Sequence, residues 1–199
     1  VMMPRARKNT RKTDATGRVR IIAGEWRRRS LEFPAVDDVR PTPDRVRETL
    51  FNWVAPVLPG SRCLDLFAGS GALGLEALSR GAEQAIFVDQ SRALMKSLRA
   101  NLATLDPGRG EVVESDVMVF LEPGNSGNTM GLVFLDPPFR AGMVEPVCER
   151  LAAGGWVETG SRVYIEHESD LPEPQLPQNW ELNRRKTAGQ VCYSLYEVG

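Results

Sequence analysis

Cysteine and histidine are scarce in this 199-residue sequence, and long apolar runs are absent. The three cysteines (Cys63, Cys148 and Cys192) are an odd number, are widely spaced and have no histidine cluster beside them, which argues against a disulfide framework or a zinc site. No apolar run approaches the roughly 20 residues that a membrane-spanning helix needs, and the N-terminus is basic rather than apolar, unlike a signal peptide. We therefore expect buried free thiols, no metal and no membrane partner, in a cytoplasmic protein.

Net charge is also small, at −1, but it is unevenly distributed. Residues 1–29 carry ten lysines and arginines against two acids, whereas the other 170 residues carry 15 against 24. A basic arm on an acidic body is typical of proteins that bind a polyanion, because each phosphate contact releases counterions. A solvated tail would have the same composition, and we expect residues 1–17 to be a disordered basic arm.

Residues 18–41 are predicted to form a small basic hairpin and linker, ahead of a single domain of residues 42–199. Two short strand-like segments, Val19–Trp26 and Arg27–Phe33, meet at a glycine-containing turn. An exposed Trp26 could stack on a base, although a lone tryptophan is more often packed. The candidate RNA contacts of this unit are Arg20, Trp26, Arg27, Arg28, Arg29 and Arg40.

The rest of the chain is organised around residues 62–74, which read R-C-L-D-L-F-A-G-S-G-A-L-G. A short apolar run, then glycines, then apolar residues at helical spacing predict a strand, a glycine turn and a helix. Glycine permits positive φ and close approach of a ligand, and the unpaired N–H groups at the helix start point at that ligand. A nucleotide-like ligand suits this turn, so the candidate cofactor contacts are Asp65, Phe67, Ala68, Gly69, Ser70 and Gly71.

Strand-like and helix-like segments alternate through the remaining sequence, which predicts a parallel sheet. Strands are expected at 84–89, 111–114, 130–135 and 162–168, helices at 91–105 and 141–151, and a closing hairpin at 180–185 and 191–198. A further helix at 44–54 precedes the glycine turn, with Thr42 as its N-cap and Pro43 in its first turn. Its start would lie near the cofactor, or, in an ordinary packing helix, Arg45 and Arg47 would be solvated.

The glycine pattern alone leaves the nucleotide open, because G-x-G-x-x-G is also the dinucleotide fingerprint and Asp89 follows at a suitable distance. However, Asp65 lies inside the first strand, where a dinucleotide site usually has an apolar residue. The strand at 130–135 runs into Asp136-Pro137-Pro138-Phe139, which has no role in hydride transfer. Together these features resemble S-adenosylmethionine-dependent methyltransferases that act on amino groups. The resemblance implies a doubly wound α/β, Rossmann-like fold with a seven-stranded sheet and a C-terminal antiparallel hairpin.

The acids at the ends of the predicted strands are the candidate ligands of that cofactor, since a doubly wound sheet binds at its carboxyl edge. Asp89 is placed to accept hydrogen bonds from both ribose hydroxyls. By resemblance, Asp116 would accept the adenine amino group. Asp65 faces the methionyl end or orders the glycine loop, and helix capping is the structural alternative for each acid.

Asp136, Pro137, Pro138 and Phe139 are the candidate catalytic residues. The Asp136 carboxylate and the Pro137 carbonyl could bind the two N–H groups of an exocyclic amine and turn its lone pair toward the methyl donor. Two prolines fix the backbone, and Phe139 offers a face for a flipped-out base. A tight turn with a capping aspartate is the alternative.

Several motifs together narrow the resemblance: R-I-I-A-G-E-W-R-R-R-x-L, R-P-T-P-D-R-V-R-E-T-L-F-N-W, L-D-L-F-A-G-S-G-A-L-G-L-E-A-L-S-R-G-A, F-V-D and L-D-P-P-F. From Arg18 to Val198 the chain resembles the bacterial small-subunit (16S) ribosomal RNA guanine-N2 methyltransferase family. The resemblance implies S-adenosylmethionine as cofactor, S-adenosylhomocysteine as product, and the small ribosomal subunit as partner of a monomer. Phe139 stands where the family commonly has tyrosine, and Glu166 and Tyr193 match family positions without assigned roles.

Rival functions remain open from the residues themselves. An adenine-N6 or protein-amide methyltransferase would share Asp136–Phe139 but would usually carry a separate recognition domain. A non-catalytic RNA-binding module would keep the basic arm but would not need an intact cofactor loop. An NAD oxidoreductase fits least well.

Overall fold

The computed structural model describes residues 16–36 and 40–199. Most of the predicted basic arm, residues 1–15, lies outside the described residues; Thr16 and Gly17, which we had assigned to that arm, belong to the first strand. The elements are β1 (Thr16–Arg20), β2 (Ser30–Pro34), α1 (Asp44–Val54), β3 (Arg62–Leu66), α2 (Ala72–Ser79), β4 (Gln84–Asp89), α3 (Arg92–Leu105), β5 (Gly110–Glu114), α4 (Val117–Leu121), β6 (Leu132–Leu135), α5 (Val144–Ala153), β7 (Arg162–Glu168), β8 (Trp180–Ala188) and β9 (Val191–Val198).

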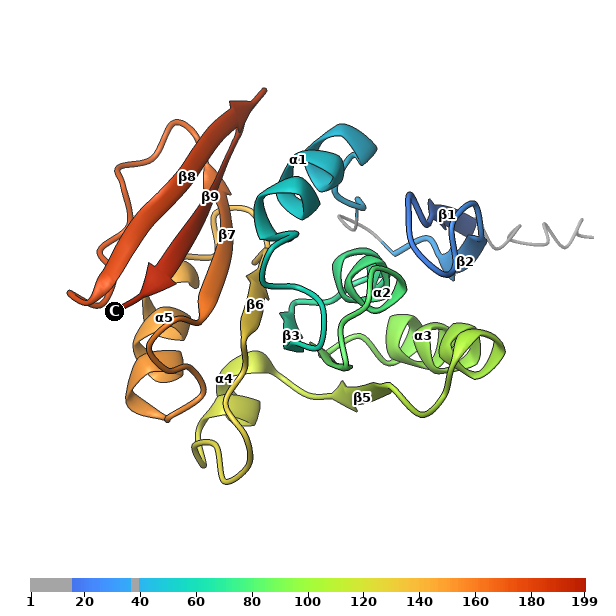
Figure 1. The fold of residues 1–199 in the computed structure, drawn as a ribbon. Helices are drawn as coiled ribbons and strands as arrows, with labels where there is room; N and C mark the ends of the chain where they lie inside the picture. The colour runs from blue at the N-terminus through green and yellow to red at the C-terminus, as the bar shows by residue number, and fades with distance from the viewer. Residues whose placement is uncertain (1–15, 37–39) are drawn as a thin grey trace, which may run out of the picture.

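A seven-stranded sheet in the order β5-β4-β3-β6-β7-β9-β8 forms the centre of the molecule (Figure 1). Strands β5, β4, β3, β6 and β7 are parallel, and β9 runs antiparallel between β7 and β8. The strand order reverses direction along the chain between β3 and β6, which is the switch point of a doubly wound sheet. The predicted fold, including its closing hairpin, is confirmed.

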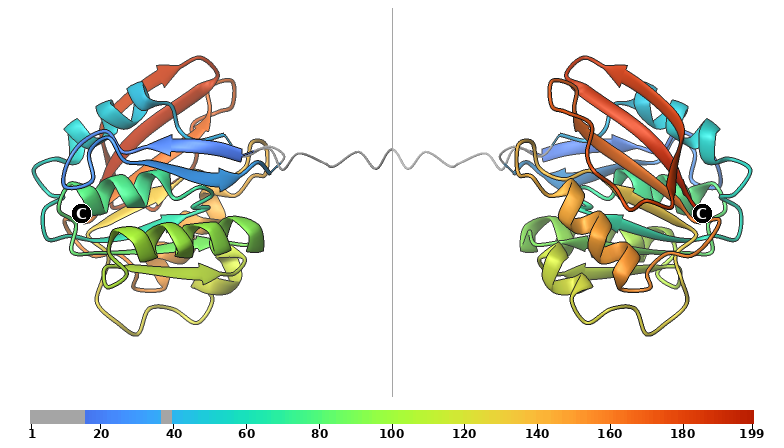
Figure 2. Two further views of the ribbon diagram at one scale, coloured as in Figure 1. Left: turned by 90° about the vertical axis from the view of Figure 1, so that its right-hand side faces the viewer. Right: turned by 90° about the vertical axis from the view of Figure 1, so that its left-hand side faces the viewer.

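Both faces of the central strands are buried, which explains their continuous apolar sequences. In β6, Leu132 and Phe134 pack into a cluster with α1, α2 and α3, whereas Val133 and Leu135 pack with α4 and α5 on the other face. The helices accordingly cover the sheet in two layers (Figures 1 and 2). All three cysteines are free and buried, as predicted.

The basic hairpin differs from its prediction in two respects. Its strands are shorter than expected, because residues 21–29 form a loop between β1 and β2. Within it, Gly24 has φ +86° and lies so close to α2 that a Cβ atom would sit 1.9 Å from the Ser79 carbonyl oxygen. The hairpin also shares the core of α1–α3 through its apolar side chains, and β2 lies along α3 (Figure 2). It therefore packs onto the helices that cover the seven-stranded sheet and shares their core.

Smaller differences concern helix ends. Pro43, not Thr42, occupies the N-cap position of α1 and makes no side-chain capping bond. Helix α5 begins at Val144, three residues later than predicted, and the short α4 was not predicted. No helix among the described residues is long and apolar enough to cross a membrane.

Candidate active site at the carboxyl edge of the sheet

The turn between β3 and α2 has the backbone conformation that its glycines predict. Gly69 and Gly71 have φ +55° and +79°, and Phe67 also has a positive φ, of +58°. A Cβ on Gly71 would lie 2.6 Å from Leu98 Cδ1, so a larger residue would also collide with α3. Ala68 donates its N–H to Val88 O at 3.0 Å, and Ser70 is buried, which ties the turn to the sheet.

Asp65 lies beneath this turn and orders it, which is one of its two predicted roles. Its Oδ2 accepts a hydrogen bond from Gly74 N at 2.9 Å, and its side chain is buried. The N–H of Gly74 belongs to the first turn of α2 and has no carbonyl partner within the helix. Burial, more than the nearby Asp89 charge, raises the pKa of Asp65 to about 8.

Asp89 and Asp116 end β4 and follow β5, at the same edge of the sheet. Asp89 accepts from Gly69 N at 3.0 Å and from Ser91 N at 2.8 Å, so it joins the glycine turn to the start of α3. Asp116 caps α4 by accepting from Met118 N and Val119 N through Oδ1, which was the structural alternative. Its Oδ2 has no partner within the described residues, and each Asp89 oxygen keeps a second lone pair. These groups fit S-adenosylmethionine, because carboxylates beside a glycine turn can accept hydrogen bonds from the ribose diol and from the adenine amino group.

Asp136 follows β6 and lies next to the glycine turn that follows the neighbouring strand β3. Leu66 pairs with Leu135 in register, so the residues that follow β3 and β6 leave from adjacent positions at the carboxyl edge. Within the described part of the chain the Pro137 carbonyl accepts no hydrogen bond, whereas Pro138 O accepts from Ala141 N. Phe139 is 53% exposed, so its ring is open to solvent. The geometry thus leaves both predicted acceptors, Asp136 and Pro137 O, beside the glycine turn.

Glu166 is the neighbour of Asp136 on the other side, and its role was not evident from the sequence. Register pairs Leu135 with Ile165, so Asp136 and Glu166, the next residues along the chain, lie at adjacent positions of neighbouring strands. Glu166 is 8% exposed and accepts from Tyr164 Oη at 2.8 Å and from Thr42 Oγ1 at 3.3 Å. Burial, and after it the Glu166 charge, raises the pKa of Asp136 well above its usual range. Burial likewise raises the pKa of Glu166, against the hydrogen bonds it accepts.

The candidate RNA contacts lie in different places. Arg27, Arg28 and Arg29 are exposed on the 21–29 loop, which contacts Ser79 at the end of α2 and Arg109 just before β5. This is the amino edge of the parallel strands, separated from the Asp136 edge by at least the length of α2, about 12 Å for eight residues. Arg20 pairs with Asp44 at 3.2 Å, and Arg40 is exposed.

Trp26 is buried, which is the alternative to base stacking that the sequence left open. Only 6% of its surface is accessible, its backbone N–H donates to Ser79 Oγ at 2.9 Å, and the Arg109 guanidinium lies 5.1 Å from its ring centroid. One ring face is therefore occupied by a cation and the rest by the core, so stacking of Trp26 on a base is not supported.

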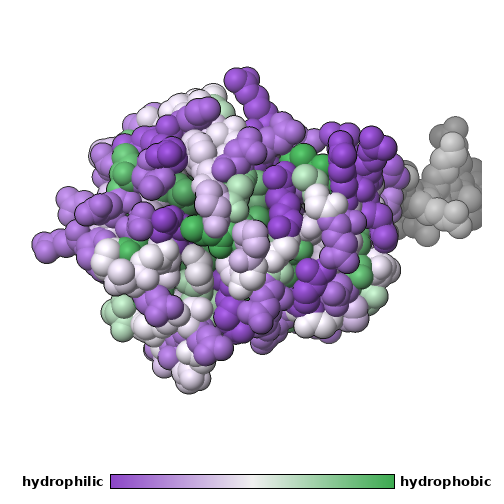
Figure 3. Space-filling model, viewed as in Figure 1, coloured by the Kyte–Doolittle hydropathy of each residue, from purple (hydrophilic) through white to green (hydrophobic). Residues whose placement is uncertain are grey.

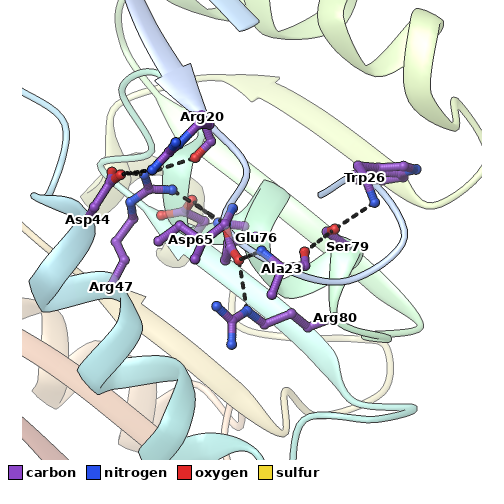
Figure 4. Close-up of polar contacts among 11 residues, drawn as sticks. Arg20, Ala23, Trp26, Asp44, Arg47, Asp65, Glu76, Ser79 and Arg80 are labelled. Carbon is purple, nitrogen blue, oxygen red and sulfur yellow. Dashed lines mark hydrogen bonds and ion pairs between the residues drawn. The ribbon is translucent and has the colours of Figure 1, made fainter. Parts of the chain in front are cut away.

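A buried ionic network fastens the hairpin loop to α2 (Figure 4). Glu76, with no exposed surface, accepts from Ile22 N, Ala23 N and Arg80 Nε at 2.8–3.0 Å and pairs with Arg47 Nη1 at 3.4 Å. Arg47, expected to be solvated if α1 is an ordinary packing helix, is 1% exposed and also binds Asp44 and the Arg20 carbonyl. The 21–29 loop is thus held by the same helix that starts at the glycine turn.

The chain is similar to known proteins over most of its length. The model of the family described as Conserved hypothetical protein 95 matches residues 19–197. Ribosomal RNA small subunit methyltransferase D of Escherichia coli (strain K12) is 50% identical over 92% of this chain and 91% of that protein. The Haemophilus influenzae protein of the same name is 42% identical over 92% and 96%. The solved structure of yhhF from Escherichia coli is 49% identical, covers 92% of this chain and 98% of its own, and superposes with a TM-score of 0.83.

Proposed function

This chain belongs to the ribosomal RNA small subunit methyltransferase D family, and we propose that it transfers a methyl group from S-adenosylmethionine to the exocyclic N2 amino group of a guanine in small-subunit ribosomal RNA. The observation that carries the proposal is the placement of Asp136 and the free Pro137 carbonyl beside the glycine turn. The names of the relatives support the ribosomal RNA substrate; the guanine N2 atom is our inference.

The cofactor would be held by the backbone of residues 67–71, by Asp89 at the ribose and by Asp116 at the adenine. S-adenosylmethionine supplies an electrophilic methyl group and leaves as S-adenosylhomocysteine. Asp65 acts indirectly, because it holds the Gly74 amide and so the conformation of the turn.

The amino group of guanine is a weak nucleophile, because its lone pair is delocalised into the ring. Asp136 and Pro137 O would each accept one of its N–H bonds and so direct the lone pair out of the ring plane. The nitrogen gains a methyl group and loses one proton, which passes to Asp136. A carboxylate of raised pKa is better matched to this proton than a free one. Phe139 would stack on the base.

The decisive experiment is mass spectrometry of nucleosides from small-subunit RNA incubated with the purified protein and S-adenosylmethionine. The RNA should come from a strain in which the corresponding gene is deleted, so that the target is unmethylated. We expect N2-methylguanosine to appear in proportion to enzyme. Methyladenosine in its place would establish the adenine-N6 alternative, and RNA binding without any methylated nucleoside would support a non-catalytic RNA-binding module.

We further propose that the protein acts as a monomer in the cytoplasm, and that the assembled particle is methylated faster than naked RNA. Folded RNA presents a surface rather than a linear sequence, and its target base must be unstacked to reach Asp136. Side-by-side initial rates on both substrates test this.

A further inference from the structure

Asp136 and Glu166 lie side by side at the carboxyl edge of the sheet, and the same row of neighbouring residues continues across β9 to β8. Glu166 of β7 pairs with Tyr193 of β9, and Tyr193 pairs with Lys186 of β8. Since Asp136 follows β6, Lys186 lies three strand spacings from it, about 14 Å at the usual distance between strands. Strand β8 is the outer edge of the sheet, so this row leads from the catalytic motif to an open surface.

Two cations on β8 share the face of the sheet that carries Tyr193. Directly paired residues project their side chains on the same face, so Lys186 lies over Tyr193 and Arg184 lies over Leu195. This is the face on which α1 packs, where Trp53 stacks on Tyr193 with ring centroids 5.4 Å apart. Arg185, between them, points to the other face and pairs with Glu173.

Arg184 and Lys186 are exposed, and neither forms an ion pair in the described part of the chain. Among the described residues, the one hydrogen bond donated by the Arg184 side chain goes to the carbonyl of its neighbour Asn183, at 2.9 Å. Figure 3 shows a mostly hydrophilic surface, broken by small apolar areas, on the side where β8 lies. Unpaired cations on an otherwise acidic body mark a place where a phosphate backbone is attracted rather than repelled.

We propose that the α1-facing side of β8, with Arg184 and Lys186, is a docking surface for the phosphates of the RNA strand that flanks the target nucleotide. The inference rests on the proposed function. It differs from the expectation drawn from the sequence, because Arg27, Arg28 and Arg29 lie at the opposite edge of the sheet. Those arginines can touch only a more distant part of the RNA while a base occupies the Asp136 site.

The test is the salt dependence of binding to naked small-subunit RNA, measured for the wild-type protein and an Arg184→Ala/Lys186→Ala variant. Each lost phosphate contact lowers the log–log slope by roughly 0.7 to 0.9, so the double variant should lose about 1.4 to 1.8. Its defect in methylation should appear in KM for RNA rather than in kcat. The matched control is Lys96→Ala/Arg150→Ala, which removes two exposed charges from α3 and α5 and should keep the wild-type slope.

An unchanged slope in the β8 variant, or an equal loss in the control, would overturn the proposal. A binding defect with the assembled particle that leaves the salt slope of particle binding unchanged would mean that β8 meets a protein, which also overturns the proposal. Failure of the proposed function has a different signature: the wild-type protein would form no N2-methylguanosine, although the RNA-binding difference between the variants could still be measured.

Discussion

Replacing Glu76 by glutamine should release the 21–29 loop from α2 and destabilise the whole domain. The substitution keeps the shape of the side chain. Among the described residues it removes the only negative charge that pairs with Arg80 and one of two that pair with Arg47. It also places an NH₂ group where the carboxylate now accepts from Ile22 N and Ala23 N.

The magnitude follows from burial. Removing one partner of a buried ion pair costs about 3 to 5 kcal/mol, because the other charge is left uncompensated. Arg47 would still be paired with Asp44 at 2.6 Å, and the Arg80 side chain is 18% exposed and can rehydrate. We therefore expect the lower end of that range, about 3 kcal/mol in the free energy of unfolding.

Urea denaturation measures this loss, with an unchanged m-value as evidence that the folded state keeps its compactness. The control is Glu48→Gln on the exposed side of α1, which should change stability by less than about 0.5 kcal/mol. Amide exchange at Ile22 and Ala23 should accelerate in the Glu76 variant. A loss below about 1 kcal/mol with normal exchange at both amides would show that the apolar core alone holds the hairpin.

Three further predictions concern the acids of the site. Asp89→Ala should weaken S-adenosylmethionine binding by about 1.5 to 3 kcal/mol in calorimetry; unchanged affinity would exclude Asp89 as a ligand. The pKa of Asp65 is about 8 in the folded protein and about 3.9 in the unfolded chain. The stability that its protonated form contributes is therefore complete below about pH 4 and is lost as the pH rises to 8, by at most about 1.4 kcal/mol per pH unit. Asp65→Asn should flatten that decline in urea denaturation at a series of pH values, and a parallel decline would refute the assignment. Glu166→Gln should move the acid limb of the single-turnover rate to lower pH, because burial and then the Glu166 charge raise the pKa of Asp136; an unshifted limb would mean that the two carboxyl groups act independently.

Local signals in the sequence indicated a parallel sheet and the common edge of the candidate cofactor acids, whereas the seven-stranded, doubly wound arrangement was implied by the family resemblance. Gly69 and Gly71 lie between a short apolar run and a segment with apolar residues at helical spacing. That change of pattern indicates a strand, a turn and a helix. Asp89 and Asp136 end apolar runs, so their common edge follows from parallel topology alone.

The remaining features depend on contacts between distant residues. Glu76 looks like any glutamate of a helix, and its backbone partners lie 53 and 54 residues earlier. The sequence left open whether Trp26 is packed or stacks on a base, and only the close approach of Gly24 to Ser79 shows that the loop turns inward and buries the ring. Glu166 is a polar residue in a central strand, which is a signal of a buried polar partner, but only the sheet register shows that the partner is Asp136.

The most direct test of the central claim is methyl transfer by Asp136→Ala on small-subunit RNA, followed as N2-methylguanosine by mass spectrometry under single-turnover conditions. Loss of a contact made mainly in the transition state should lower the rate by at least about 100-fold. Calorimetry should show nearly unchanged affinity for S-adenosylmethionine. Rates within a few-fold of wild type would contradict the account, because Asp136 would then be a turn residue and the chemistry would lie elsewhere.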